Sequence, residues 1–222
     1  MSKALRWLLA FSIFPQILML KLLTHYPQIV ETYYSNLLYP FISKLFRLVF
    51  GWLPFSVGDL IYSMALIFML RWSYKLIKKG FKQLRLKDDL IGIMVAASSV
   101  YFMFHLLWGL NYYRIPIEQR LNLNSEYTTT ALIEVTQKLI VRSNELHSEI
   151  SKDRSKLFEI PYDFKKISKK VAQGYTALSI SYPFLAYGPP SQKQSLYSLP
   201  LAYMGFSGYL NPFTNEAQVN SK

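Results

Sequence analysis

The residues best suited to bind a catalytic metal are three histidines, and they lie far apart in the sequence. His25, His105 and His147 form no HExxH motif and no other pair at ligand spacing, whereas a hydrolytic zinc site needs two such histidines and a third ligand. The chain has no cysteine, which excludes disulfides, thiolate zinc sites and cysteine nucleophiles. Glycine-rich phosphate loops and the GxSxG nucleophile elbow are also absent from the sequence. The sequence therefore contains no recognisable catalytic set.

A few single residues could still do chemistry, and each has a plainer interpretation. Asp59 lies in an otherwise apolar stretch and could be a functional acid inside a membrane, but an acid so close to a helix start is expected to be solvated at the interface. His105 could be a ligand or a proton relay, yet no second ligand stands one helical turn away, so a hydrogen-bonded packing histidine is expected. His147 stands between Glu145 and Glu149. These three do not share one helix face tightly, which predicts a solvated flank.

The segment that orients these residues is an uncharged run at 90–110, which contains no Asp, Glu, Lys or Arg. As a helix, a run of this length spans about 30 Å, the thickness of the hydrocarbon core of a bilayer. A basic stretch precedes it, and lysine and arginine beside a short loop favour the cytoplasmic side. Everything after Arg114 is then expected outside the inner membrane. The residues expected to fix this orientation are Arg71, Lys75, Lys78, Lys79, Lys82, Arg85 and Lys87.

Two further spans are predicted, near 4–23 and 56–74. The first begins after Lys3 and should be kinked by Pro15; a signal peptide and an amphipathic anchor lying on the surface are the alternatives. Between the two spans, apolar residues recur at helical spacing over 28–50, with prolines at 27 and 40 that should break the pattern. We expect short interfacial helices there, although helices packed on a soluble core would show the same periodicity.

After residue 114 the composition becomes that of a soluble domain. Helices are predicted at 131–150 and 163–179, followed by a loop over 182–194. Short strands are predicted around 201–204 and 216–220. The predicted fold class is therefore a membrane α-helical region of three transmembrane helices, residues 1–114, followed by a small α+β extracytoplasmic region, residues 115–222.

The composition agrees with a membrane protein. The 222-residue chain is 51% hydrophobic, and its net charge of +12 is clustered beside the apolar spans. A charge placed in this way favours the lipid bilayer as its partner and argues against nucleic acid.

Three ordered motifs carry a resemblance to a known family. They are Leu-Pro-Phe-Ser-Val-Gly-Asp at 53–59, Trp-Gly-Leu-Asn-Tyr-Tyr-Arg at 108–114, and Tyr-Met-Gly-Phe-Ser-Gly at 203–208 with Asn-Pro-Phe-Thr-Asn-Glu-Ala-Gln-Val-Asn at 211–220. Together they resemble the DUF3810 family of Bacteroidetes membrane proteins. The resemblance implies a zincin-like zinc metallopeptidase, in which three membrane helices precede a domain carrying HExxH.

The resemblance also limits what is expected of this chain. In the family, the zinc helix follows the segment that matches 211–220, and the present sequence reaches Lys222 before it. No zinc ligand can be carried over, so zinc is expected only for a full-length member and no cofactor is expected in this chain. The expected function is the N-terminal portion of such a peptidase, inactive alone. The alternative is a non-enzymatic membrane interaction or scaffold protein.

The resemblance further suggests that the end of the chain is a sheet edge which could receive an extended peptide substrate or a partner strand. A strand that ends a chain leaves one row of backbone groups unpaired, and a frayed tail is the alternative. Glu216 is then expected to guard the edge, so that Glu216→Val would increase self-association. The candidate residues of this edge are Tyr203, Gly205, Asn211, Pro212, Phe213, Glu216 and Asn220.

Overall fold

The computed structural model describes residues 2–79, 86–123, 126–151, 161–186 and 191–220. The chain divides into two compact units. One comprises Met1–Arg114 with Leu178–Lys222, and the other comprises Ile115–Ala177. Residues 178–222 thus group with residues 1–114. The division at residue 114 into a membrane region and an extracytoplasmic region stays a prediction. Two residues of the predicted orienting set, Lys82 and Arg85, lie outside the described residues.

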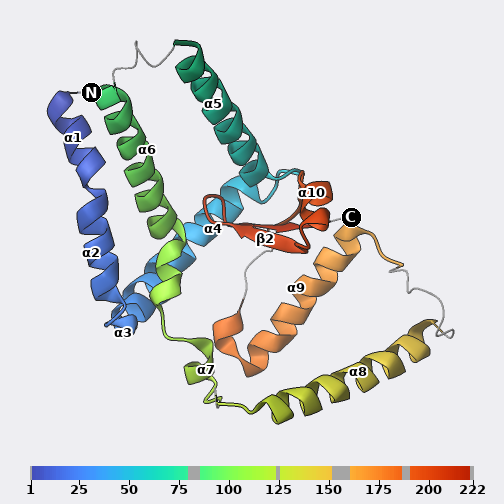
Figure 1. Ribbon diagram of the computed structural model, residues 1–222. Coiled ribbons are helices and arrows are strands. Elements are labelled where there is room, and N and C mark those ends of the chain that lie inside the picture. Colours follow the sequence, from blue (N-terminus) through green and yellow to red (C-terminus); the bar gives the residue numbers. More distant parts are fainter. Residues whose placement is uncertain (1, 80–85, 124–125, 152–160, 187–190, 221–222) are drawn as a thin grey trace. The chain divides into compact units, whose positions relative to one another are not determined.

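The first unit begins with α1 (Lys3–Phe11) and α2 (Ile13–Leu23), which lie beside α6 (Leu86–Leu107) and start at the same end (Figure 1). The helix is interrupted at Ser12, because Pro15 has no N–H to donate to the carbonyl four residues back and its ring crowds that turn. The interruption lies within one turn of the position where Pro15 predicts a kink. Lys3–Leu23 and Lys87–Leu107 are both long and apolar enough to cross a membrane, as expected for two of the three spans.

A small polar cluster joins these two helices halfway along their length. The Ser12 and Ser98 hydroxyl oxygens lie 2.7 Å apart, and Gln16 Nε2 donates to both at 3.1 Å. Ser98 is almost fully buried, so α6 packs closely against the N-terminal helices at this point. Polar side chains in an apolar environment gain by finding each other, so this cluster fixes the register of α6 against the N-terminal helices.

The segment 27–50 is one continuous helical run rather than helices separated by prolines. It consists of α3 (Pro27–Ile29), the π-helix η1 (Val30–Leu38) and α4 (Tyr39–Phe50). The break predicted at Pro40 is wrong. The turn before it is π-helical, with the Tyr39 N–H bonded to the Tyr34 carbonyl, and this wider turn leaves room for the proline ring.

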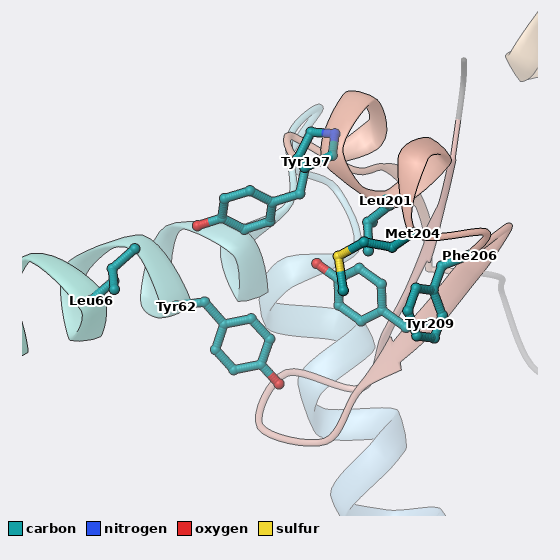
Figure 2. A pocket seen from close by; sticks show the side chains of 8 residues that line it. Tyr62, Leu66, Tyr197, Leu201, Met204, Phe206 and Tyr209 are labelled. Carbon is teal, nitrogen blue, oxygen red and sulfur yellow. The ribbon is translucent and has the colours of Figure 1, made fainter.

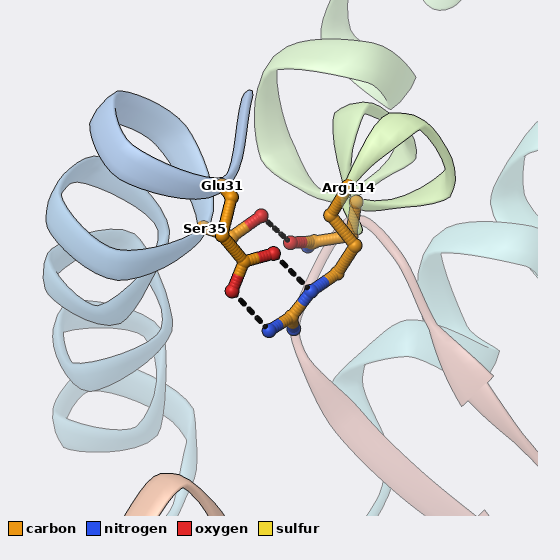
Figure 3. Close-up of polar contacts among 4 residues, drawn as sticks. Glu31, Ser35 and Arg114 are labelled. Carbon is orange, nitrogen blue, oxygen red and sulfur yellow. Dashed lines mark hydrogen bonds and ion pairs between the residues drawn. The ribbon is translucent and has the colours of Figure 1, made fainter. Parts of the chain in front are cut away.

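The π-helix is held to the 3₁₀ turn η3 (Gly109–Tyr113) by an ion pair (Figure 3). Arg114 Nε and Nη2 donate to the two carboxylate oxygens of Glu31 at 3.0 and 2.9 Å, and Glu31 is buried. Beside this pair the Ser35 hydroxyl donates to Asn111 Oδ1 at 2.9 Å. The motif at 108–114 therefore fixes η3 against η1 by a two-pronged contact that only arginine can make.

Replacing Arg114 with lysine is expected to destabilise the protein by about 1–2 kcal/mol, because an ammonium cannot make the two parallel hydrogen bonds and Glu31 stays buried. Chemical denaturation in detergent would measure this. The matched control is Arg142→Lys, at an exposed Arg142–Glu145 pair, which should change stability by less than about 0.5 kcal/mol. Equal effects at the two positions would contradict the role given to the Glu31–Arg114 pair.

The next helix, α5 (Val57–Lys79), covers the third predicted span. It is less apolar than the other two, since Asp59 and Arg71 lie within it, and it is not one of the two helices that meet the length and composition of a span.

The C-terminal part of the first unit is a three-stranded sheet. It contains β1 (Gln192–Gln194), β2 (Gly208–Asn211) and β3 (Glu216–Val219) in the order β1-β3-β2. β3 is parallel to β1, with Gln192 opposite Ala217, and antiparallel to β2, with Gly208 opposite Val219. The strand predicted near 216–220 is confirmed, whereas β1 lies within the predicted loop 182–194.

The strand predicted at 201–204 is wrong, because these residues belong to the short helix α10 (Ser198–Tyr203). Pro200 suits the first turn of a helix. Gly205 then ends it with φ +76°, and the Phe206 N–H returns to the Leu201 carbonyl at 2.9 Å. This is a glycine helix stop, which few other residues could form.

The second unit contains α7 (Ile117–Arg120) and α8 (Thr129–Ser151), together with most of α9 (Phe164–Ser181), which is followed by the 3₁₀ turn η4 (Pro183–Leu185). The two long helices confirm the predictions at 131–150 and 163–179. Thr128 Oγ1 and Asp163 Oδ1 accept backbone N–H groups of the first turns at 3.1 and 2.8 Å, as N-cap side chains do.

Candidate functional site

The candidate site is the place where the C-terminal sheet meets the start of α5, and its interior is unusually polar. The largest fully buried side chains of the described residues include Gln218, Glu216, Asn211, Thr214, Asp59 and Ser56. Buried polar groups cost free energy unless each finds a partner. The geometry of this interface is therefore set by hydrogen bonds rather than by apolar packing.

Glu216 caps the positive end of α5. Its carboxylate accepts hydrogen bonds from the N–H groups of Val57 at 3.2 Å and Gly58 at 2.7 Å, and from the Thr214 hydroxyl at 2.9 Å. The first N–H groups of a helix lack partners inside the helix, and the helix dipole favours a negative group there. Glu216 is 0% exposed, so the prediction that it guards a solvent-facing strand edge is wrong.

Asp59 binds the sheet from the opposite direction. Its carboxylate accepts from the Leu196 N–H at 2.7 Å, from the Ser195 hydroxyl at 3.2 Å and from the Tyr209 hydroxyl. Asp59 is 0% exposed, so the expectation of a solvated interfacial acid is wrong. These donors come from residues far along the chain, which no local helix rule can anticipate.

Ser56 and Lys193 complete the polar interface. Ser56 Oγ accepts the Asp59 N–H at 3.0 Å and the Gln218 amide at 2.9 Å, so one hydroxyl caps α5 and holds β3. Lys193 Nζ donates to the Gly51 carbonyl at 2.9 Å and to the Leu53 carbonyl. Burial lowers the pKa of the Lys193 ammonium, while the nearby Glu216 charge acts to raise it. Its carbonyl contacts tie the sheet to the turn before α5.

The hairpin between β2 and β3 is folded by two asparagines. Asn211 Oδ1 accepts the N–H groups of Phe213 and Thr214 at 2.9 and 3.2 Å, an Asx-type turn. Asn215 adopts φ +54°, which asparagine tolerates better than most residues. Its side-chain oxygen accepts the Tyr39 hydroxyl at 2.8 Å. The hairpin thereby contacts both the start of α5 and the start of α4.

An apolar pocket of about 500 Å³ opens beside this polar core. Figure 2 shows Tyr62 and Leu66 of α5 facing the side chains of α10, its flanking residues and β2. The lining residues are Tyr62, Leu66, Tyr197, Pro200, Leu201, Met204, Phe206 and Tyr209. The pocket is suited to an apolar group, and the Tyr209 hydroxyl lies between it and the Asp59 carboxylate.

Tyr209 makes the interface sensitive to alkaline pH. Burial, with a further contribution from the hydrogen bond to Asp59, raises the pKa of the Tyr209 hydroxyl. An unfolded tyrosine loses its proton near about pH 10. Above that pH the folded state therefore binds more protons than the unfolded state, and stability falls as the pH rises.

Tyr209→Phe is expected to flatten this alkaline loss of stability and to cost about 1–2 kcal/mol at neutral pH, since Asp59 loses one donor. Unfolding midpoints of the two proteins between about pH 8 and about pH 11 would show the difference. Tyr127→Phe, at an exposed tyrosine, is the control and should follow the wild-type curve. Parallel curves for wild type and Tyr209→Phe would contradict the assignment.

The structure brings together only some residues of the predicted substrate edge. Asn211 and Glu216 meet at the start of α5, and Phe213 packs edge-on against Tyr62 with ring centroids 6.4 Å apart. Pro212 lies in the hairpin and Asn220 donates to the carbonyl of Phe206 at 3.0 Å. Tyr203, at 86% exposed, and Gly205 belong to the α10 turn instead.

The predicted edge at 216–220 is wrong, because β3 is paired on both sides. Sequence reasoning also missed several polar residues that hold the sheet. The sequence gives no signal for those in and around β1, because residues 191–195 are all polar. The alternating burial of Ser191, Lys193 and Ser195 is visible only in the structure. The residues that were missed are Ser56, Lys193, Ser195, Tyr209 and Gln218.

His105 makes a local contact within its own helix. His105 Nδ1 lies 2.9 Å from the Tyr101 carbonyl, which confirms a hydrogen-bonded packing histidine. Across the described ranges, no group of three or more His, Cys, Asp or Glu side chains could hold a metal ion. The side chains that the structure describes therefore offer no ligand set that fits the zinc site of a zincin.

The comparisons with known proteins identify the family of this chain. A family model described as "Protein of unknown function (DUF3810)" matches residues 34–222. No curated protein and no solved structure matches the chain. The matched region contains all three motifs and every polar contact between α5 and the C-terminal sheet. The chain therefore belongs to the DUF3810 family of proteins of unknown function.

Proposed function

We propose that these 222 residues form the membrane-anchoring and sheet-bearing part of a zincin-like zinc metallopeptidase of Bacteroidetes. One observation carries the proposal: the motif at 53–59 and the motif at 211–220 are in direct contact, because Glu216 accepts the Val57 and Gly58 N–H groups and the Gln218 amide donates to the Ser56 hydroxyl. Two motifs that resemble the family, far apart in sequence, build a single polar interface. In a full-length member this interface would hold the sheet in place while the zinc helix that follows it supplies the metal chemistry.

The proposed topology has three spans, near 4–23, 56–74 and 90–110, in the inner membrane. Arg6 and Lys87 lie at the shared start of the two candidate spans, where Arg6 Nη2 donates to the Asp88 carbonyl at 3.2 Å. Positive residues at one end favour the cytoplasmic side. Residues 115–222 are then periplasmic, and the sheet lies near the outer headgroups at the start of α5.

Reporter fusions test this topology. Alkaline phosphatase fused after Arg114 is expected to be active, and a fluorescent protein fused there is expected to be dark, since neither reporter works on the opposite side. The same pair fused within the basic segment after α5 is the control and should give the reverse result. A fluorescent, phosphatase-negative fusion after Arg114 would contradict the orientation.

The peptidase part of the proposal is tested on protein purified from native membranes through an N-terminal tag. The expected result is a protein that holds one zinc per chain and cleaves peptides. Expressed alone, the 222-residue chain should neither bind zinc stoichiometrically nor cleave casein. Zinc held tightly by the 222 residues alone would mean that ligands from distant segments form a site.

A second function, a non-enzymatic interaction or scaffold module, is favoured by one specific observation. The apolar pocket beside α10 is built entirely from the first unit and has a volume of about 500 Å³, which suits an apolar side chain of a protein or peptide partner. A native product that lacks zinc and peptidase activity, but retains a co-purifying partner lost in Leu201→Asp, would support this alternative over the peptidase.

A further inference from the structure

A second cavity, of about 230 Å³, lies at the shared beginning of α1 and α6, away from the sheet. It is confined to the first unit and to two helices that touch each other directly through the Arg6–Asp88 contact. Its lining residues are Lys3, Arg6, Trp7, Lys87, Asp88 and Ile91.

The cavity carries an excess of positive charge. Three of its side chains are cations and one, Asp88, is a carboxylate, with Asp89 next along the helix. Within the part of the chain that the structure describes, none of the three cations is ion-paired with a carboxylate. Arg6 instead donates to the Asp88 backbone carbonyl, and Lys87 Nζ lies 5.7 Å from the centre of the Trp7 ring. The cations are thus held close together without being neutralised.

The N-terminal ends of α1 and α6, which carry the positive end of each helix dipole, both lie at this cavity. α1 begins at Lys3 and α6 at Leu86, and the dipole of a helix favours an anion near its first turn. The three cations and the two helix starts therefore act in the same direction. An anion with several acceptor oxygens would find ammonium and guanidinium donors around it.

The position along the helices identifies the source of the anion. Lys3–Leu23 and Lys87–Leu107 are the two helices suited to cross a bilayer, and both begin at the cavity. Trp7 is 40% exposed beside it, and tryptophan prefers the headgroup level of a membrane. The cavity thus lies where lipid phosphates lie, directly above the apolar surfaces of the two helices.

We propose that this cavity binds the phosphate of an anionic phospholipid headgroup in the cytoplasmic leaflet. The acyl chains would extend along the exposed apolar surfaces of α1, α2 and α6. The proposal rests on the membrane-spanning part of the proposed function and is independent of zinc or peptidase activity. Phosphate is the shared chemistry of a lipid headgroup and of free inorganic phosphate, and the experiment separates these two sources.

The test is a thermal-shift titration of the detergent-solubilised full chain. Phosphatidylglycerol should raise the unfolding midpoint saturably, whereas phosphatidylcholine and inorganic phosphate at the same phosphate concentration should have little effect. The triple variant Lys3→Gln, Arg6→Gln, Lys87→Gln should bind phosphatidylglycerol at least about tenfold more weakly. Equal stabilisation by inorganic phosphate would overturn the lipid assignment in favour of a free anion.

The matched control removes three charges elsewhere, by Arg71→Gln, Lys75→Gln and Lys78→Gln on α5, all exposed side chains. It should retain wild-type affinity. If the control loses as much affinity as the cavity variant, binding reflects net charge and the proposal fails.

The single variants Lys3→Gln and Lys87→Gln remove no hydrogen bond among the described residues. Each single variant should bind phosphatidylglycerol measurably more weakly, while its unfolding midpoint without lipid stays that of the wild type. Unchanged binding in both single variants would also overturn the proposal.

Discussion

Replacing Glu216 with alanine is expected to destabilise the folded C-terminal sheet by at least about 3 kcal/mol, because it leaves three buried donors without an acceptor. These donors are the N–H groups of Val57 and Gly58 and the hydroxyl of Thr214. The favourable interaction of a carboxylate with the start of α5 is lost as well. Hydrogen exchange of the 191–220 segment, followed by mass spectrometry, would show the sheet opening while α1 and α6 stay protected.

The matched control is Glu134→Ala, which removes an exposed acid paired with Lys138 on α8 and should cost less than about 0.5 kcal/mol. Glu216→Val should behave like Glu216→Ala. If Glu216→Val aggregates, the cause is a sheet that has separated from α5 and not the loss of a charge at a strand edge. Glu216→Val and Glu216→Ala should therefore scatter light equally. Protection of 191–220 that is the same in Glu216→Ala as in wild type would contradict the capping role.

The second large effect is expected at Gly58, where the usual rule for helical glycines should be reversed. Replacing a helical glycine with alanine ordinarily stabilises by about 0.5–1 kcal/mol. A Cβ at Gly58, however, would lie 2.3 Å from Asn211 Nδ2 and 2.5 Å from its Cγ. Asn211 is fully buried and folds the hairpin through its Oδ1. Gly58→Ala is therefore expected to destabilise by about 2–3 kcal/mol, a typical penalty for overpacking.

Gly174 on α9 provides the matched control, because a Cβ there meets nothing within 4 Å. Gly174→Ala should follow the ordinary rule and stabilise the protein. Unfolding in detergent would compare the two variants directly, and the expected result is a difference in sign. A stabilising Gly58→Ala would mean that Asn211 does not press against the first turn of α5.

The sequence was sufficient for features set by local composition and periodicity. The uncharged run at 90–110 predicts α6, the position of Pro15 predicts a disturbed helix near Ser12, and the helix predicted at 163–179 matches α9. Each depends on residues within about one or two helical turns of each other. The family resemblance also came from contiguous motifs, and the family model confirms it.

The candidate site was harder to predict because its contacts join residues far apart in the chain. Asp59 looked like an ordinary acid in a first helical turn, and its burial depends on donors from Ser195, Leu196 and Tyr209. Glu216 looked like a surface charge on a strand, and its burial depends on α5. Periodicity shows only which face of a helix or strand is apolar. A polar face that packs inside the protein is therefore wrongly predicted to face solvent.

The short elements near the C-terminus were misassigned for a related reason. The residues 201–204 are apolar and β-compatible, yet Pro200 and Gly205 start and stop a single helical turn there. β1 is polar in every residue, so composition favours a loop, and only pairing with β3 makes it a strand. Short elements are stabilised mainly by tertiary contacts, which a single sequence does not reveal.

The central claim is that the start of α5 holds the C-terminal sheet, and disulfide formation tests it most directly, because the chain has no cysteine of its own. A Cβ at Gly58 would lie 2.9 Å from Asn211 Cβ, so a small shift reaches the roughly 3.5–4.5 Å separation that a disulfide needs. Gly58→Cys with Asn211→Cys should therefore cross-link rapidly in native membranes after mild oxidation. Leu60→Cys with Asn211→Cys, on another face of α5, should not. A Gly58–Asn211 variant that cross-links no faster than the Leu60–Asn211 control would contradict the docking of the sheet on α5.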